Sequence, residues 1–194
     1  MIMMKVVRIF PEGEPAQEGP AIYSVHYDQE SSHELDRLFD AWSDVEYLQA
    51  FFEENKDDLC GGYYACMSVD KAVERTLDDA ESLEDYLEEL TEEASYNPQQ
   101  ALESLFEPLR DTDFRLVRFQ ESKVKRCGFK RSTWLRLYAI RINSNRYVIT
   151  GGAIKLTKKM QDREHTRKEL DKLQQVKNFL VANDGDEGFE FLQI

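Results

Sequence analysis

The sequence is poor in cysteine, in histidine and in long apolar runs. Its 194 residues include three histidines and three cysteines, Cys60, Cys66 and Cys127, with no C-x-x-C pair. An odd, sparse set of this kind is typical of reduced thiols, so Cys60 and Cys66 are expected to be core thiols. No apolar run approaches the roughly 18 to 20 residues of a membrane helix. The first residues also lack the features of a secretion signal, and we expect a cytoplasmic protein that does not enter a membrane.

The motifs of well-marked enzyme classes are missing as well. The sequence contains no G-x-x-x-x-G-K phosphate loop, no G-x-S-x-G nucleophile turn and no H-E-x-x-H zinc motif. Eleven carboxylates lie between Asp70 and Glu93, but without the D-x-D-x-D-G spacing of a calcium loop. The sequence therefore predicts neither a metal site nor a cofactor, and it gives no support to the common nucleotide, serine and zinc hydrolases.

Charge is distributed very unevenly along the chain. The net charge is −13, yet residues 1–109 carry 6 Lys and Arg against 27 Asp and Glu, whereas residues 110–182 carry 19 against 7. The average alone argues against nucleic-acid binding, but the basic segment permits it. We expect an acidic N-terminal part, residues 1–109, and a basic C-terminal part, residues 110–194, folded together as one compact unit.

Hydrophobic periodicity predicts an α+β fold with a mainly antiparallel, twisted sheet. Candidate strands, rich in β-branched and aromatic residues, span residues 3–10, 21–27, 114–119, 134–142 and 146–156. The last two flank an Asn143-Ser144-Asn145 turn and form a hairpin. A polar stretch over residues 120–132 precedes that hairpin. The sheet core is therefore expected between residues 114 and 156.

Apolar spacing of three and four residues predicts the helices. A capping box at Ser31 and Glu34 opens the first of them, and a second box follows at Ser43 and Glu46. Further helices are expected over residues 68–94, in a short segment that ends by residue 108, and over residues 160–182. The 68–94 helix has one apolar face and one acidic face, which either serves solubility or contacts the basic part of the chain.

Reactive residue types concentrate in the basic segment. Strand alternation places Trp134, Arg136 and Tyr138 on one face, opposite Leu135 and Leu137 on the core face. Further candidates for a cationic surface are Lys123, Lys125, Arg126, Lys130, Arg131, Lys155, Lys158, Lys159, Arg163 and Arg167. A cationic concavity with aromatic surface is suited to hold a phosphodiester backbone and to stack a base. The alternative is that these are ordinary solvent-facing residues or partners of the acidic helices.

The same segment resembles the C-terminal half of RelE/HigB-type toxins of toxin-antitoxin systems. The likeness lies in the runs WLRLYAIRI, residues 134–142, and YVITGGAIKLTKKMQDREH, residues 147–165, and covers about residues 110–173. It implies a small twisted antiparallel sheet packed by helices, a cognate antitoxin as partner and, for active members, cleavage of mRNA on the ribosome. Attack of a ribose 2′-OH on the adjacent phosphate is the implied reaction.

Residue roles follow from this resemblance position by position. Arg136 and Lys155 would clamp phosphate, Tyr138 would stack or orient a base, and Lys158 or Lys159 would stabilise charge. His165 would be the general acid, because its side chain titrates near neutrality.

The acidic N-terminal half is absent from the family pattern and suggests two further hypotheses. The acidic helix would lie across the basic hairpin in place of an antitoxin and mask it. Alternatively, the protein is a non-catalytic interaction protein whose acidic helical face binds a basic partner.

Overall fold

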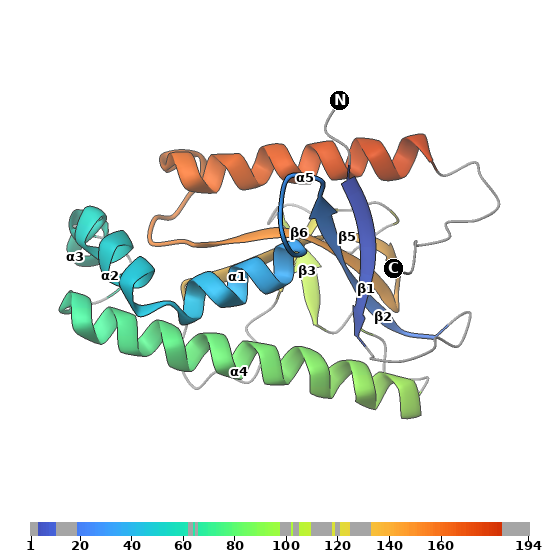
Figure 1. Cartoon of the computed structure of the whole chain (residues 1–194), viewed down its shortest axis with the longest axis horizontal. Coiled ribbons are helices and arrows are strands. Elements are labelled where there is room, and N and C mark those ends of the chain that lie inside the picture. Colours follow the sequence, from blue (N-terminus) through green and yellow to red (C-terminus); the bar gives the residue numbers. More distant parts are fainter. Residues whose placement is uncertain are drawn as a thin grey trace.

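The computed structural model describes residues 4–10, 19–61, 64, 66–97, 102, 105–109, 118, 121–124 and 133–183. In these residues one six-stranded sheet lies between two helical layers, with α5 along one side and α1 and α4 along the other (Figure 1). The strands are β1 (Met4–Phe10), β2 (Ala21–Tyr27), β3 (Phe106–Pro108), β4 (Glu121–Val124), β5 (Leu135–Asn143) and β6 (Arg146–Ile154), in the order β1-β2-β6-β5-β4-β3. Strands from both the acidic and the basic part of the chain therefore share one sheet.

The α+β class is confirmed, but the sheet is mixed rather than purely antiparallel. The pairs β1–β2, β3–β4, β4–β5 and β5–β6 are antiparallel, whereas β2 runs parallel to β6, from Ala21 opposite Arg146 to Ser24 opposite Ile149. A parallel pair needs a long connection, and the helices and strands between β2 and β6 supply it. The hairpin predicted around the Asn143-Ser144-Asn145 turn is confirmed, and β1 and β2 form an antiparallel pair of their own. The parallel junction between the two pairs is a long-range pairing that local patterns do not indicate.

Two short strands at the sheet edge differ from the sequence-based expectation. The predicted polar stretch contains β4, whose Ser122 hydroxyl donates to the Ala139 carbonyl, and the predicted short helix ends in β3. The candidate strand at residues 114–119 lies outside the described residues except for Arg118. The β5–β6 register shifts between Tyr138 and Ala139, which leaves Thr150 as an extra residue directly before Gly151. This irregularity is a β-bulge next to Gly151 and Gly152.

Among the described helices, α1, α2 and α4 begin at side-chain caps, although not always at the predicted ones. The helices are α1 (Glu34–Ser43), α2 (Val45–Glu54), α3 (Lys56–Gly61), α4 (Val69–Tyr96), the short 3₁₀ helix η2 (Met160–Asp162) and α5 (Glu164–Ala182). Ser68 caps α4 and Asp44 caps α2 through side-chain oxygens. The capping box at Ser31 is wrong, because the His33 ring accepts the Asp36 N–H and the Glu34 carboxylate bonds Arg37 and Lys172 instead.

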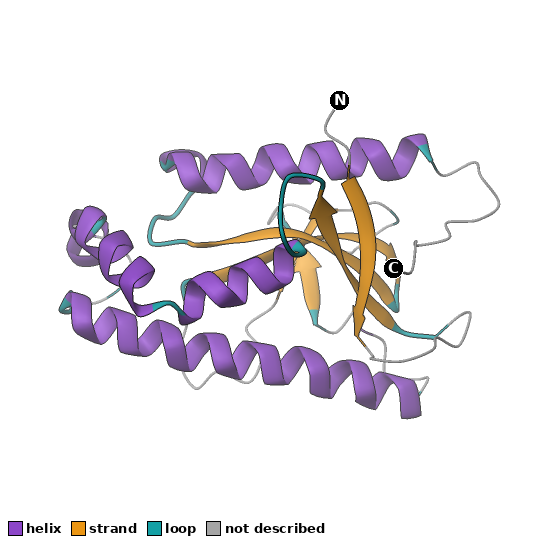
Figure 2. Cartoon of the chain, viewed as in Figure 1, coloured by secondary structure: helices purple, strands orange, loops and turns teal. Residues whose placement is uncertain are grey.

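Apolar residues cover both faces of the sheet. Leu135 and Leu137 of β5 pack with α1, α2 and α4, whereas Tyr138 and Ile140 pack with Val176 and the rest of the buried stripe of α5. The arrangement is visible in Figure 2, where helices flank the sheet on both sides. The expectation that one face of β5 remains available is therefore wrong over most of its length, because α5 covers it.

Trp134 also lies on the unexpected side. Its indole N–H donates to the Thr76 hydroxyl at 3.0 Å, and the Arg75 guanidinium lies 4.3 Å from its ring. Trp134 precedes the first residue of β5, so strand alternation does not govern its direction. It anchors the hairpin to α4 and presents no surface to a base.

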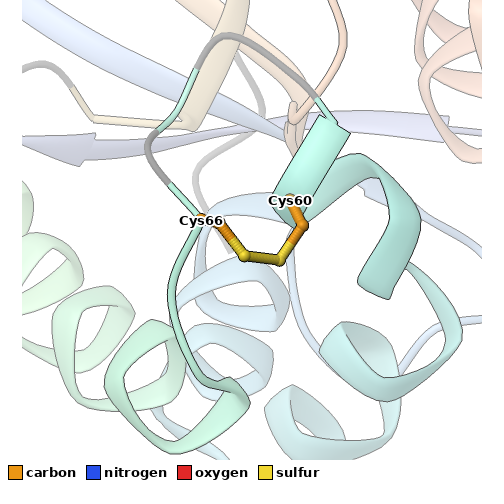
Figure 3. Close-up of a disulfide and its surroundings, with 2 residues drawn as sticks. All are labelled: Cys60 and Cys66. Atoms are coloured by element: carbon orange, nitrogen blue, oxygen red, sulfur yellow. A yellow bond between two sulfur atoms is a disulfide. The ribbon is translucent and has the colours of Figure 1, made fainter.

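The structure contains a disulfide between Cys60 and Cys66 (Figure 3). The bond joins the last turn of α3 to the segment that precedes α4, and both cysteines are exposed. The expectation of reduced core thiols at these positions is wrong. No helix in the described ranges combines the length and the apolarity that crossing a bilayer requires.

Candidate functional site

A basic cleft of about 560 Å³ opens beside β4 and β5, next to the edge strand β3. Its lining includes five of the cations predicted from sequence, which are Lys123, Arg136, Lys155, Lys158 and Lys159. The hairpin brings them together, because Arg136 pairs with Ala153 across the β5–β6 ladder and Lys155 follows two residues later. The backbone N–H of Lys155 donates to the Trp134 carbonyl at 2.8 Å, and this bond holds the two strands together at the end of the hairpin. We call this site the basic cleft.

Arg136 of the basic cleft is held by hydrogen bonds to backbone carbonyls. Its NH1 group donates to the carbonyls of Thr133 and Leu135, each at 2.7 Å. The Tyr64 hydroxyl donates to the same Thr133 carbonyl at 3.0 Å. Both Arg136 bonds use one terminal nitrogen, so they fix the direction of the guanidinium plane. A preset fork of N–H donors is suited to bind phosphate oxygens.

The other cations of the basic cleft differ in their exposure and in whether a carboxylate lies close enough to compensate their charge. Lys158 and Lys159 are exposed, whereas Lys155 is half-buried. Lys123 lies 3.6 Å from the Glu107 carboxylate, and Glu121 pairs with Lys177 at 3.1 Å. The acids thus lie toward β3 and β4, and the cationic end of the cleft lies toward η2.

Tyr138 lines the basic cleft but is too deeply buried for its predicted role. Its side chain is 1% exposed beneath α5, and its hydroxyl has no hydrogen-bond partner among the described residues. Burial raises the pKa of Tyr138, and the nearby Glu169 carboxylate adds to the rise against the opposing charge of Arg136. A buried neutral phenol cannot stack a base from solution, so this prediction is corrected.

The remaining sequence candidates divide into two groups. Lys125, Arg126, Lys130 and Arg131 lie outside the described residues. Arg163, His165 and Arg167 belong to the start of α5 and do not line the basic cleft. Arg163 forms a two-point ion pair with Asp58, and Arg167 is exposed. The Nε2 atom of His165 lies 3.1 Å from the Ile154 carbonyl, which directs the ring into a different cavity from that of Arg136.

That different cavity, of about 630 Å³, lies between α1, α2 and the start of α5, and we call it the aromatic groove. Trp42, Tyr47 and Phe51 contribute aromatic surface, and Glu34, His165, Lys168, Glu169 and Lys172 contribute polar groups. Glu34 and Glu169 are only 2% and 7% exposed. Lys172 bridges them, with its Nζ 2.7 Å from Glu34 and 3.0 Å from Glu169. A buried charge network therefore forms one wall of the groove.

Sequence reasoning missed Glu169, although a signal was present. Glu169 occupies a position of the buried α5 stripe, which is formed by Thr166, Glu169, Leu173, Val176 and Leu180 at three- and four-residue spacing. A carboxylate in an apolar stripe must find a partner or a ligand. Gly151 stands opposite, and a Cβ at Gly151 would collide with the Glu169 Oε2 atom. The missing side chain of this glycine thus makes room for the carboxylate.

Burial and neighbouring charges shift the titration of this network. Burial, which outweighs the attraction of Lys172, raises the pKa of Glu169 to about 6. Burial opposes the charge of Lys172, but the carboxylates of Glu169 and Glu34 prevail and raise the pKa of Lys172. Burial is the largest cause of the raised pKa values of Tyr27 and Tyr47, and the negative charge of Glu169 raises both further. Glu169 is therefore a carboxyl group that changes charge near neutral pH.

The carboxylates of α4 face away from the sheet. Ten of the eleven between Asp70 and Glu93 are exposed, while Leu83 and Leu87 point to the core and Leu83 borders the basic cleft. Partial burial and the charges of Asp85 and Asp36 raise the pKa of Glu84, so α1 and α4 share one acidic surface. This orientation gives no support to masking of the basic hairpin by α4.

The described residues contain no set of three or more His, Cys, Asp or Glu side chains placed to hold a metal ion. No protein-family model, no curated protein and no solved structure matches the chain. The basic cleft and the aromatic groove are therefore interpreted from their own chemistry.

Proposed function

We propose that the chain is a toxin-antitoxin-related protein with a RelE/HigB-like C-terminal core, which binds RNA through the basic cleft. The convergence of five cations from β4, β5 and the segment after β6 carries this proposal. Phosphate contacts dominate nucleic-acid affinity, and an acidic protein needs such a local concentration of positive charge to make them. The proposal includes a cytoplasmic location and, as partners, RNA or the ribosome and a cognate antitoxin.

Cleavage of mRNA is a narrower form of this proposal. Arg136 and Lys155 would stabilise the charge on the phosphorane, and Lys158 or Lys159 would assist them. Neither Tyr138 nor His165 is placed to transfer a proton in the basic cleft, because Tyr138 is buried and His165 lies in the aromatic groove. Within the part of the chain that the structure describes, binding is thus better supported than catalysis.

The proposal is tested by RNA affinity in matched variants. Fluorescence anisotropy with a labelled single-stranded RNA at low salt measures affinity for the wild type, for Lys158→Ala with Lys159→Ala, and for Lys71→Ala. Lys71 is an exposed cation of α4, far from the cleft in sequence. The double variant is expected to bind about tenfold more weakly, and Lys71→Ala as tightly as wild type. Equal loss in both variants, or no RNA affinity in the wild type, contradicts the proposal.

Expression in growing cells separates cleavage from binding. If the protein is an endoribonuclease, overexpression arrests growth and degrades mRNA, and Arg136→Ala or Lys155→Ala relieves both effects. Normal growth with intact mRNA contradicts the cleavage proposal and leaves RNA binding to the anisotropy test.

The second candidate function is a non-catalytic interaction protein that binds a basic partner through the acidic surface of α1 and α4. The raised pKa of Glu84, caused by partial burial and by its carboxylate neighbours, favours it, because a cation there would relieve their repulsion. A basic polypeptide such as polylysine is the probe. Loss of its binding in Glu84→Gln with Glu88→Gln supports this function, and unchanged binding in that variant contradicts it.

A further inference from the structure

The Cys60–Cys66 disulfide closes a short ring of the chain that contains Tyr64. Both cysteines are exposed, whereas the Tyr64 side chain is buried. Figure 3 shows the bond between the end of α3 and the segment that precedes α4. The same ring therefore combines a crosslink that solvent can reach with an aromatic side chain anchored in the core.

Tyr64 is connected to the basic cleft through the Thr133 carbonyl. Its ring lies edge-on against Trp134, with the ring centroids 5.1 Å apart, and its hydroxyl donates to the Thr133 carbonyl at 3.0 Å. The Arg136 NH1 group donates to the same carbonyl at 2.7 Å, and both Thr133 and Arg136 line the cleft. Tyr64 thus helps to position the carbonyl that orients the Arg136 guanidinium.

The crosslink restricts the positions that Tyr64 can take. A closed ring has far fewer backbone conformations than an open segment of the same length, because its ends are joined. Cleavage of the disulfide returns this freedom to the segment. The fraction of molecules in which the Tyr64 hydroxyl meets the Thr133 carbonyl then falls, since ordering the anchor costs more conformational entropy.

Exposure makes the bond accessible to small thiols. In the cytoplasm, a disulfide is typically transient and redox-sensing, and exposed disulfides are the more easily reduced ones. The thiolate of a first thiol molecule, such as glutathione, attacks one sulfur, and the other leaves as a thiolate and takes a proton. A second thiol molecule resolves the mixed disulfide. Two electrons and two protons pass to the protein, which gains two thiols, and the reductant becomes a disulfide.

We propose that the Cys60–Cys66 disulfide is a redox switch for the basic cleft. The oxidised form holds Arg136 in its RNA-binding orientation through Tyr64, and the reduced form releases it. The switch changes the position of one cation and leaves the charge of the cleft unchanged. It rests on the proposed RNA-binding function and on the cytoplasmic location.

RNA affinity in the two redox states tests the proposal on the full chain. Fluorescence anisotropy with a labelled single-stranded RNA compares protein oxidised by glutathione disulfide with protein reduced by dithiothreitol, with free thiols counted in both samples. Partial loss of one phosphate contact predicts about threefold weaker binding after reduction. Equal affinity in the two states, or failure of the bond to form, overturns the proposal.

Cysteine variants assign the effect to this bond. The double variant Cys60→Ser with Cys66→Ser should bind RNA like the reduced wild type under both conditions. Cys127→Ser is the matched control, because it keeps both cysteines of the bond, and it should retain the threefold difference. A redox difference that persists in the double variant overturns the proposal.

Tyr64→Phe tests the route from the bond to the cleft. A phenylalanine ring keeps the contact with Trp134 but has no hydroxyl for the Thr133 carbonyl. This variant should bind RNA as weakly as the reduced wild type in both redox states. A full threefold redox difference in Tyr64→Phe overturns the proposal.

Hydrogen exchange of the Leu135 amide reports the switch without RNA. This N–H donates to the Thr133 hydroxyl at 3.1 Å, so reduction should speed its exchange about threefold. Faster exchange combined with no RNA affinity in either redox state refutes the proposed function and supports the link between the disulfide and Thr133. RNA affinity that is identical in the two states refutes the switch alone.

Discussion

The basic cleft and the aromatic groove lie on either side of the start of α5 and differ in where their charged groups lie: the cleft exposes its lysines to solvent, whereas the groove buries its carboxylates. The cleft leaves Lys158 and Lys159 exposed at the protein surface, where water and salt screen them. The groove buries Glu34 and Glu169 and compensates them with Lys172. Exposed charges contribute little to stability and remain available to a ligand, whereas buried charges couple the site to folding. Stability measurements should therefore distinguish the two sites.

The largest stability effect is expected at the bridge of the buried network. Lys172→Met leaves two buried carboxylates without their shared cation, and breaking a buried pair of this kind costs about 3 to 5 kcal/mol. Urea unfolding at pH 7 measures the loss. The matched change in the cleft, Lys158→Met, should alter the free energy of unfolding by less than about 0.5 kcal/mol. Equal costs at the two positions would remove the contrast between the sites.

A smaller loss is expected where the two sites share backbone. A Cβ at Gly152 would lie 2.6 Å from the Arg136 carbonyl and 2.9 Å from the Leu38 side chain. Gly152→Ala should destabilise the fold by about 3 kcal/mol, because a backbone atom cannot move aside as a side-chain end can. Gly61→Ala is the control, since no described residue places an atom within 4 Å of its added Cβ. Thermal unfolding compares them, and an unaffected midpoint in Gly152→Ala contradicts the close packing.

The pH dependence of stability should reveal Glu169. Its pKa, raised by burial from 4.5 to about 6, means that the folded state favours the protonated form. The associated stability is present below the unfolded pKa and is lost as the pH rises through about 6. Relative to Glu169→Gln, the wild type should therefore lose about 2 kcal/mol between pH 4 and pH 8. Parallel pH profiles for the two proteins would show that Glu169 is not the titrating group.

Local sequence patterns predicted which cationic side chains lie in the cleft, but they did not predict that α5 covers most of that face of β5. The hairpin and its turn determine that Arg136 and Lys155 lie close together, because their placement depends on neighbouring residues along two adjacent strands. Tyr138 shares a sheet face with Arg136 as alternation requires, but whether that face is open depends on α5, which packs from elsewhere in the chain. Exposure is a tertiary property, so the alternation could not decide it.

The groove shows what sequence reasoning leaves out when it follows residue types alone. Lys172 forms ion pairs with both Glu169 and Glu34, and Glu34 lies 138 positions before Lys172 in the sequence. Nothing in the local pattern of α1 indicates that Glu34 turns inward rather than capping its helix. The parallel junction of β2 and β6 is likewise a long-range pairing, and the Glu34–Lys172 ion pair forms beside it between the start of α1 and α5. The position of Glu169 on an apolar stripe was the single local clue.

The salt dependence of RNA binding tests the central claim most directly. The logarithm of the association constant is measured against the logarithm of salt concentration for the wild type and for the triple variant Arg136→Ala, Lys155→Ala and Lys158→Ala. Each lost phosphate contact lowers the slope by roughly 0.7 on a single strand, so the triple variant should have a slope shallower by about two. An identical slope for the two proteins would contradict RNA binding through the basic cleft.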